Sequence, residues 1–118
     1  MAVKRTIKFR IWNKTSKEMY QPHAFIEDYE SRDDIELMQF TGLSDRLGKE
    51  IYEGDIIQVP HKLMKKYKWE VIFHKGAFVL SDKIGFRHFY SQKYSQNYEV
   101  IGNIYESKHL FGNSIVGK

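Results

Sequence analysis

The sequence predicts a small, mainly β domain, and three observations on its 118 residues support that fold class. Aromatic residues make up 15% of the chain, and aromatic and β-branched side chains favour the half-buried surface of a pleated sheet. Apolar and polar residues alternate in several short runs, as in strands with one buried face. Glycines separate these runs, as turns between short strands require. We therefore expect an all-β fold, a small SH3-like barrel or roll with an N-terminal β-hairpin extension.

The length and composition set the class of protein to expect. A chain of 118 residues corresponds to one domain, and 42% hydrophobic residues supply enough apolar surface for one core. Cysteine is absent, which excludes disulfide scaffolds and thiolate metal sites and suits a reducing compartment. No apolar run approaches the roughly 18 residues of a membrane span. We therefore expect no signal peptide, no membrane association and a cytoplasmic location.

The N-terminal part predicts a hairpin followed by an acidic connector. Apolar residues alternate with cations over residues 7–11, until Trp12 breaks the alternation, and the polar residues 13–17 favour a turn. Residues 18–20 can then pair back with the first strand. After Pro22, the acid-rich stretch 27–36 is expected to form a loop or a short helix. We divide the chain into a hairpin and connector (1–36), a barrel (37–106) and a C-terminal tail (107–118).

Charge is distributed unevenly along the chain. Residues 1–17 contain six basic residues and no acid, whereas residues 18–36 contain seven acids and one arginine. Because opposite charges stabilise neighbouring strands, we expect the basic first strand to lie beside the acidic segment. Residues 62–118 contain ten basic residues against four acids. This basic excess is modest compared with that of a dedicated nucleic-acid-binding protein.

Three glycines punctuate the main body. We expect Gly42 to end a strand that starts at residue 37. Gly48 is expected to close a turn in which Asp45 accepts hydrogen bonds from its own backbone. Gly54 allows a sharp corner, and Asp55 would cap its freed N–H groups, an opening that recurs in small SH3-like barrels. Further strands are expected at residues 56–59, 68–74, 77–81, 85–90 and 98–105.

Several segments resemble the YopX family. They are MQFTGL at 38–43, GKEIYEGDI at 48–56 and YEVIGNIYE at 98–106, and the opening IKFRIW at 7–12 is similar to the family's N-terminal strand. The resemblance implies a phage or prophage protein of Gram-positive hosts with an SH3-like barrel in its C-terminal part. It implies no activity, because the family has no established biochemical function. Residues 27–36, 62–68 and the last twelve match no family pattern, so a function peculiar to this member is expected there.

No motif predicts catalysis. The five histidines lack the close spacing of metal ligands. Glu50, Glu53 and Asp55 lie close enough in sequence to suggest acid–base or metal chemistry. However, the Gly54 corner is expected to splay Glu53 and Asp55 apart, and turns favour aspartate for backbone reasons. Nucleophile elbows and phosphate-binding glycine loops are absent. We therefore expect a protein that is not an enzyme and has no cofactor.

The stretch 62–69 interleaves four lysines with apolar and aromatic residues. In one interpretation the lysines contact phosphates while an aromatic ring stacks on a base, as in proteins that bind single strands. In the other interpretation, which we favour, this is a solvated loop whose apolar members pack into the core. The residues that would form a nucleic-acid-binding surface are Lys65, Lys66, Lys68, Trp69 and Arg87.

The sequence as a whole favours a non-catalytic protein-binding module. The expected partner is a host or phage protein, bound at a sheet edge or at an aromatic surface between loops. Nucleic acid is the alternative partner, although the acidic segment would repel phosphates. A homo-oligomer that associates through an edge strand is as compatible with the sequence as a monomer is. The apolar residues of the tail 107–118 would pack on the barrel, dock on a neighbouring copy or fray.

Overall fold

The computed structural model describes residues 6–22, 27–58, 68–82, 86–89 and 97–107. Within these ranges nearly all of the regular structure is β, which confirms the predicted all-β fold class. The helix α1 is a single turn. The elements are β1 (Phe9–Asn13), β2 (Glu18–Tyr20), α1 (Glu27–Glu30), β3 (Ile35–Ser44), β4 (Glu50–Tyr52), β5 (Asp55–Gln58), β6 (Lys68–His74), β7 (Ala77–Ser81), β8 (Phe86–Phe89) and β9 (Glu99–Asn103).

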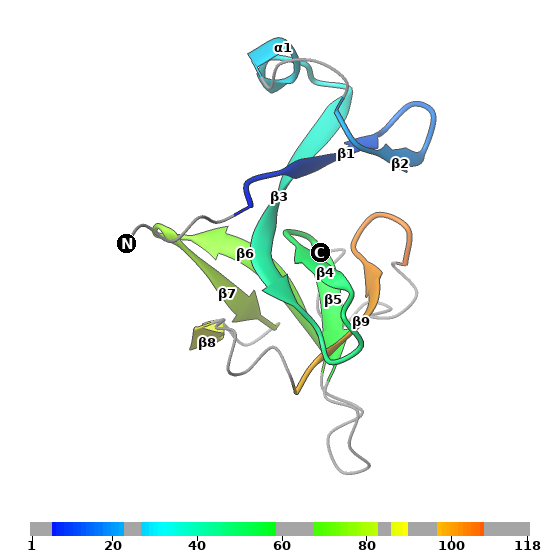
Figure 1. Ribbon diagram of the computed structural model, residues 1–118. Helices are drawn as coiled ribbons and strands as arrows, with labels where there is room; N and C mark the ends of the chain where they lie inside the picture. The colour runs from blue at the N-terminus through cyan, green and yellow to red at the C-terminus, as the bar shows by residue number, and fades with distance from the viewer. Residues whose placement is uncertain (1–5, 23–26, 59–67, 83–85, 90–96, 108–118) are drawn as a thin grey trace.

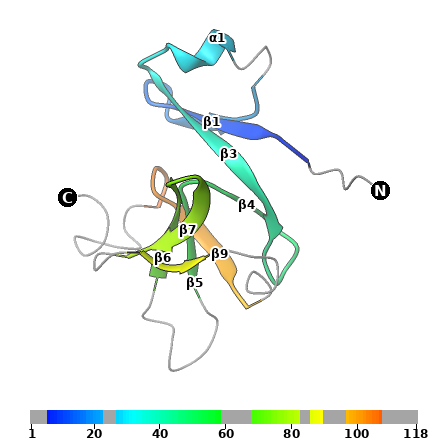
Figure 2. The ribbon, with the colours of Figure 1, turned by 90° about the vertical axis from the view of Figure 1, so that its left-hand side faces the viewer.

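The strands form two antiparallel sheets (Figure 1). The N-terminal sheet has the order β2-β1-β3-β4 and the C-terminal sheet the order β8-β7-β6-β5-β9. The C-terminal sheet curls into a half-barrel, with β3 and β4 crossing beside it (Figure 2). The strands predicted at residues 68–74 and 77–81 coincide with β6 and β7, which pair around the turn at Lys75 and Gly76.

The predicted N-terminal hairpin is confirmed, since Trp12 of β1 faces Met19 of β2. On its other edge β1 pairs with β3, from Phe9 opposite Gln39 to Asn13 opposite Ile35. The expected boundary between residues 36 and 37 therefore falls inside β3, and the hairpin shares one sheet with β3 and β4. Most of the predicted tail, residues 108–118, lies outside the described residues.

The expected contact between the basic start and the acidic segment is present. The Lys14 Nζ lies 2.9 Å from Glu36 Oε2 and also donates a hydrogen bond to the carbonyl of Asp33. These contacts follow from pairing of β1 with the start of β3, which places opposite charges on adjacent strands.

The prediction that Gly42 ends a strand is wrong. Instead, β3 continues to Ser44 and passes Gly42 at a φ of +88°. The register between β3 and β4 shifts between Phe40 and Ser44, so the left-handed residue is accommodated as an irregularity within the strand. The Thr41 hydroxyl donates to the carbonyl of Ile51 and accepts from the N–H of Leu43, which supports the irregular segment.

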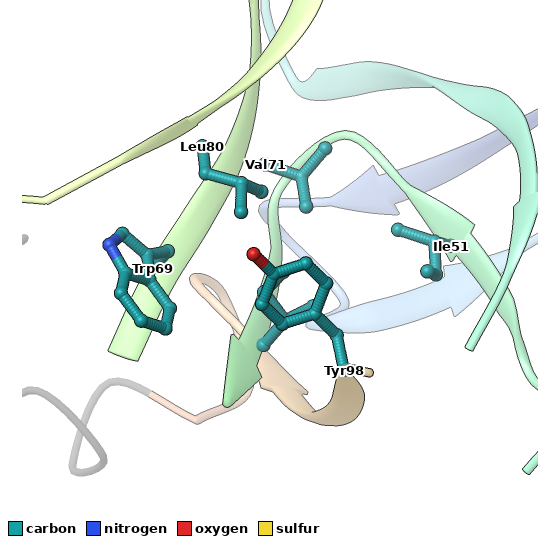
Figure 3. Close-up of a cluster of buried hydrophobic side chains, with 6 residues drawn as sticks. Ile51, Trp69, Val71, Leu80 and Tyr98 are labelled. Carbon is teal, nitrogen blue, oxygen red and sulfur yellow. The ribbon is translucent and has the colours of Figure 1, made fainter. Parts of the chain in front are cut away.

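Each sheet has its own buried cluster. The larger cluster lies inside the half-barrel (Figure 3), where the Trp69 and Tyr98 rings meet edge to face at 6.1 Å. Ile51 of β4 also enters this cluster, so the N-terminal sheet contributes to the core of the C-terminal one. The members are Ile51, Ile57, Trp69, Val71, Leu80 and Tyr98. The smaller cluster, under α1, consists of Ile11, Tyr29 and Ile35.

Gly54 is the point at which the chain passes from β4 in one sheet to β5 in the other. Its φ is +84°, its N–H donates to the carbonyl of Val71, and its carbonyl accepts from the N–H of Ile104. A Cβ at this position would lie 3.1 Å from the Sδ of the buried Met38. The backbone conformation therefore favours glycine, and a Cβ would also require the Met38 side chain to move by a few tenths of an ångström.

We predict that Gly54→Ala lowers the free energy of unfolding more than Gly76→Ala does. Both glycines have a φ of +84°, so each alanine incurs the left-handed backbone penalty of roughly 1–2 kcal/mol. Only Gly54 also crowds a neighbour, because nothing lies within 4 Å of a Cβ at Gly76. Crowding in a packed interior adds roughly 1 kcal/mol or more. Urea unfolding of both variants measures the difference, and equal losses would contradict the crowding argument.

Candidate functional site

A buried ion pair joins the two sheets. Arg10 on β1 places its Nη2 2.7 Å from Asp55 Oδ1 on β5, and the same nitrogen donates to the carbonyl of Glu53 at 3.2 Å. The side chains are only 12% and 2% exposed. The guanidinium also lies over the Tyr52 ring, with its Cζ 4.8 Å from the ring centroid. A residue near the N-terminus is thus fixed to the corner between β4 and β5.

Asp55 also caps that corner, as predicted from the sequence. Its Oδ2 accepts the N–H of Tyr52 at 2.8 Å. Burial raises the pKa of Asp55 above its usual value, while the Arg10 charge and the Tyr52 N–H act in the opposite direction. Glu53 points elsewhere, since its Oε1 accepts the N–H of Gln39. Glu50 pairs with Lys8. The three acids Glu50, Glu53 and Asp55 therefore do not converge on one site.

The turn that follows β9 also contacts β1 and so joins the two sheets at a second place. The Asn103 Oδ1 accepts the N–H groups of Tyr105 and Glu106, so its side chain shapes the turn. Tyr105 then stacks on Trp12 of β1, with ring centroids 5.6 Å apart. Burial and the nearby charges of Glu36, Glu70 and Glu53 raise the pKa of Tyr105 to about 12. The Tyr105 hydroxyl therefore remains protonated at neutral pH.

A second buried acid, Asp45, organises the turn between β3 and β4. Its carboxylate is enclosed, with the residue only 2% exposed. The Oδ1 accepts the N–H groups of Leu47 and Lys49, at 2.8 and 2.9 Å, which confirms the predicted turn. The Oδ2 accepts the N–H of Val100 on β9, at 2.9 Å. One carboxylate thus fixes the turn internally and ties it to the C-terminal sheet.

Backbone hydrogen bonds fix this turn further. The N–H of Asp45 donates to the carbonyl of Lys49, and the N–H of Gly48 donates to the carbonyl of Asp45. Arg46 is held as well, because its N–H donates to the carbonyl of Tyr98. At the centre of this constrained backbone the Leu47 side chain is 66% exposed. We call residues 45–49 the Asp45 turn.

A comparison with protein families shows which family the chain belongs to. The family model described as "YopX protein" matches residues 21–111, which include both the junction corner and the Asp45 turn. The chain belongs to the YopX family. The matched region begins after the N-terminal hairpin, so β1 and β2 lie outside it.

Two solved structures are similar in fold to this chain. The protein EF1440 from Enterococcus faecalis superposes with a TM-score of 0.70 at 24% identity, covering 91% of this chain and 99% of that one. The protein yopX from Bacillus subtilis superposes with a TM-score of 0.54 at 18% identity, covering 87% of this chain and 96% of that one. Comparison with curated protein sequences gives no match.

The basic and aromatic residues predicted to bind nucleic acid have different environments. Lys68 begins β6 opposite Gln58 and is half-buried. Trp69 is 5% exposed and packs in the half-barrel core, as the structural interpretation of this stretch expects. Lys65 and Lys66 lie outside the described residues, and Arg87 lies in β8, where only the backbone is described. The ring of Trp69 therefore faces the core rather than a bound base.

The described residues form no cluster of three or more acids, histidines or cysteines that could hold a metal ion. In the same part of the chain, no helix has the length and apolar character needed to cross a membrane. A shallow hollow of about 680 Å³ lies between the β1–β2 hairpin and Glu106, and another of about 600 Å³ lies beside α1. Each hollow is lined by one local stretch, 13–20 or 29–37, together with one distant residue, Glu106 or Lys14, and sequence reasoning found neither hollow.

We predict that Arg10→Met destabilises the fold by about 3–5 kcal/mol at neutral pH, because it leaves the Asp55 carboxylate buried without its cation. The pKa of folded Asp55 is already raised, and loss of Arg10 raises it further. Protonation is then favoured in the folded state, so the stability deficit relative to the wild type shrinks as the pH falls through the raised pKa. Unfolding in urea across a pH series measures this.

The variant Arg10→Met/Asp55→Asn should recover part of the loss at neutral pH, because an amide needs no counter-charge and still accepts the Tyr52 N–H. As a control, Lys14→Met breaks the exposed Lys14–Glu36 pair and should cost only about 0–1 kcal/mol. A deficit for Arg10→Met that is the same at acidic and neutral pH would rule out an ionised, buried Asp55.

We predict that Asp45→Asn loosens the contact between the Asp45 turn and β9. An amide has one acceptor oxygen, so either the N–H of Val100 or the N–H groups within the turn would face an NH2 donor. The expected loss is about 1–3 kcal/mol, with faster hydrogen exchange at an amide that loses its acceptor. The exposed Asp28→Asn is the control and should leave stability within about 0.5 kcal/mol. Unchanged exchange at Leu47, Lys49 and Val100 would contradict this role.

Proposed function

We propose that this YopX-family chain is a phage or prophage accessory protein that acts in the bacterial cytoplasm as a non-catalytic protein-binding module. The observation that supports this proposal best is the Asp45 turn. It presents Leu47, with 66% of that side chain exposed, on a backbone that a buried carboxylate fixes. The turn is the anchor with which the module would contact a protein partner.

An exposed leucine by itself carries little information, because single apolar side chains are common on protein surfaces. Leu47 differs from the other large apolar side chains exposed in the described residues, Ile7 and Phe73. Phe73 is covered in part by Phe78, whose ring centroid lies 5.1 Å away, and Ile7 precedes β1 outside any regular element. A side chain on a preorganised turn loses little further backbone freedom on binding, which is a property of good interface anchors.

The use of the buried acids also supports a binding role over a catalytic one. Asp45 accepts three backbone N–H groups, and Asp55 accepts one backbone N–H and the Arg10 guanidinium. Carboxylates with these partners shape turns and join sheets. Those functions match the fold signature of the family-like segments, which contain glycines, apolar strand positions and a few charges.

We predict that Leu47→Ser weakens capture of a protein partner without unfolding the chain. The immobilised wild type and variant would be exposed to lysate from host cells in which the phage genes are expressed. Truncating a central apolar anchor typically costs about 2 kcal/mol or more, a fall in affinity of roughly thirtyfold. Phe73→Ser is the matched control, because it removes another exposed apolar side chain (53% exposed, against 66% for Leu47) from β6 in the other sheet.

The alternative, nucleic-acid binding, is tested with the same proteins by fluorescence anisotropy of short DNA and RNA over a salt series. If binding weakens log-linearly with salt and is lost on replacing Lys65, Lys66, Lys68 and Arg87 by alanine, the chain contacts phosphates instead. A captured protein that Leu47→Ser and Phe73→Ser retain equally would reject the Asp45 turn as the anchor.

A further inference from the structure

The hollow beside α1 has apolar residues at its floor and a charged rim, on which Glu30, Asp33 and Glu36 outnumber Lys14 and Arg32. The floor comes from Tyr29 and Ile35, which are only 7% and 6% exposed, and from Leu37, which packs against them; the Arg32 guanidinium lies over the Tyr29 ring, 5.8 Å from its centroid. Glu30 and Asp33 stand on the rim and are exposed to solvent. The hollow measures about 600 Å³, which is ample for one leucine side chain with its neighbours.

The charges around this hollow are only partly compensated. Lys14 pairs with Glu36, and Arg32 pairs with Asp34 at 2.6 Å. Among the described residues no cation lies within salt-bridge distance of the carboxylates of Glu30 and Asp33. The rim therefore presents two negative charges that an incoming basic surface could pair with.

The Asp45 turn has the opposite character. The exposed Leu47 lies between two exposed cations in the chain, Arg46 and Lys49. The contact of Arg46 with Glu99 is long, at 3.9 Å, and no salt-bridge partner lies near Lys49 in the described part of the chain. One apolar side chain flanked by two cations thus matches an apolar floor flanked by two carboxylates.

These two surfaces cannot meet within one chain. The hollow lies at the first residues of β3, and the Asp45 turn follows its last residue. A strand of ten residues spans roughly 33 Å, at about 3.3 Å per residue. Figures 1 and 2 both place α1 and the β3–β4 turn at opposite ends of that strand. Only a second copy can bring the two surfaces together.

We propose that the Asp45 turn of one copy docks into the α1 hollow of a second copy. Leu47 would cover the floor at Tyr29 and Ile35, while Arg46 and Lys49 would face Glu30 and Asp33. This inference rests on the proposed function, in which the Asp45 turn is the anchor, and it names a second copy of the chain as the partner. Because the two surfaces differ, the contact is head to tail, and further copies can add to both ends or close a ring.

The test is sedimentation velocity of the full chain over a concentration series at low and at physiological salt. We expect the wild type to associate reversibly, and more weakly as salt screens the exposed charges. The turn variant Arg46→Glu/Lys49→Glu and the rim variant Glu30→Lys/Asp33→Lys should each associate at least about tenfold more weakly, since each places like charges opposite one another. Lys17→Glu/Lys75→Glu, which makes the same charge change on exposed hairpin turns, should associate like the wild type.

The decisive measurement is the equimolar mixture of the turn and rim variants. Every contact between unlike variants then pairs opposite charges, so the mixture should recover association that neither variant has alone. The chain with all four substitutions should recover it too. A mixture that stays monomeric, or a wild type that is monomeric at every concentration, overturns the inference.

The same experiment separates this inference from the proposed function. If the wild type does not self-associate but still captures a foreign protein that Leu47→Ser loses, the docking into a second copy is wrong and the binding module stands. If self-association occurs but the turn and rim variants leave it unchanged, the copies meet at another surface and the inference is wrong.

Discussion

The structure depends on how a buried carboxylate is neutralised where the chain crosses from one sheet to the other. Asp55 caps the corner after Gly54 by accepting the Tyr52 N–H, and in this position it is only 1% exposed. A carboxylate buried to that degree is costly without a counter-charge. Arg10 supplies the charge from β1, so the corner between β4 and β5 determines where the N-terminal strand lies. Stacking of Tyr105 on Trp12 then closes the junction from the side of β9.

An ion pair of this kind contributes more to the choice of one arrangement than to net stability. Desolvation offsets much of the attraction between buried charges, and within the described chain the Arg10 Nε makes no hydrogen bond. The ion pair has a clearer effect on the register of β1. A slip of β1 by one residue would turn Arg10 to the opposite face and bring an apolar neighbour, Phe9 or Ile11, against Asp55. The pair therefore penalises misaligned pairing of β1 with β3, which hydrophobic burial alone would penalise less.

The sequence predicted what depends on neighbours in the chain. The β6–β7 hairpin and the turn-capping roles of Asp45 and Asp55 follow from alternation and from local turn chemistry. The pairing of Arg10 with Asp55 and of Asp45 with Val100 could not be predicted, because the partners are 45 and 55 residues apart and alternation identifies a buried face without its partner. Gly42 was misassigned because a left-handed residue normally ends a regular strand. In β3 the irregular pairing with β4 accommodates this residue within the strand. Leu47 gave no sequence signal, since only the burial of Asp45 distinguishes its turn from an ordinary loop.

The contrast between residues that shape the fold and residues that the fold leaves exposed also bears on what family membership says about this chain. The segments that resemble the family supply the corner, the closing turn after β9 and, through the N–H of Lys49, part of the Asp45 turn. These residues are engaged in backbone capping and sheet joining, so they specify a scaffold. Leu47 and Arg46 lie between two such segments, and Glu30 and Asp33 lie in the acidic stretch, although the family model spans all four residues. A scaffold of this kind can keep its fold while the exposed side chains that it presents change. Under the proposed function, the partner is therefore to be sought at the side chains that the fold holds in place but does not use.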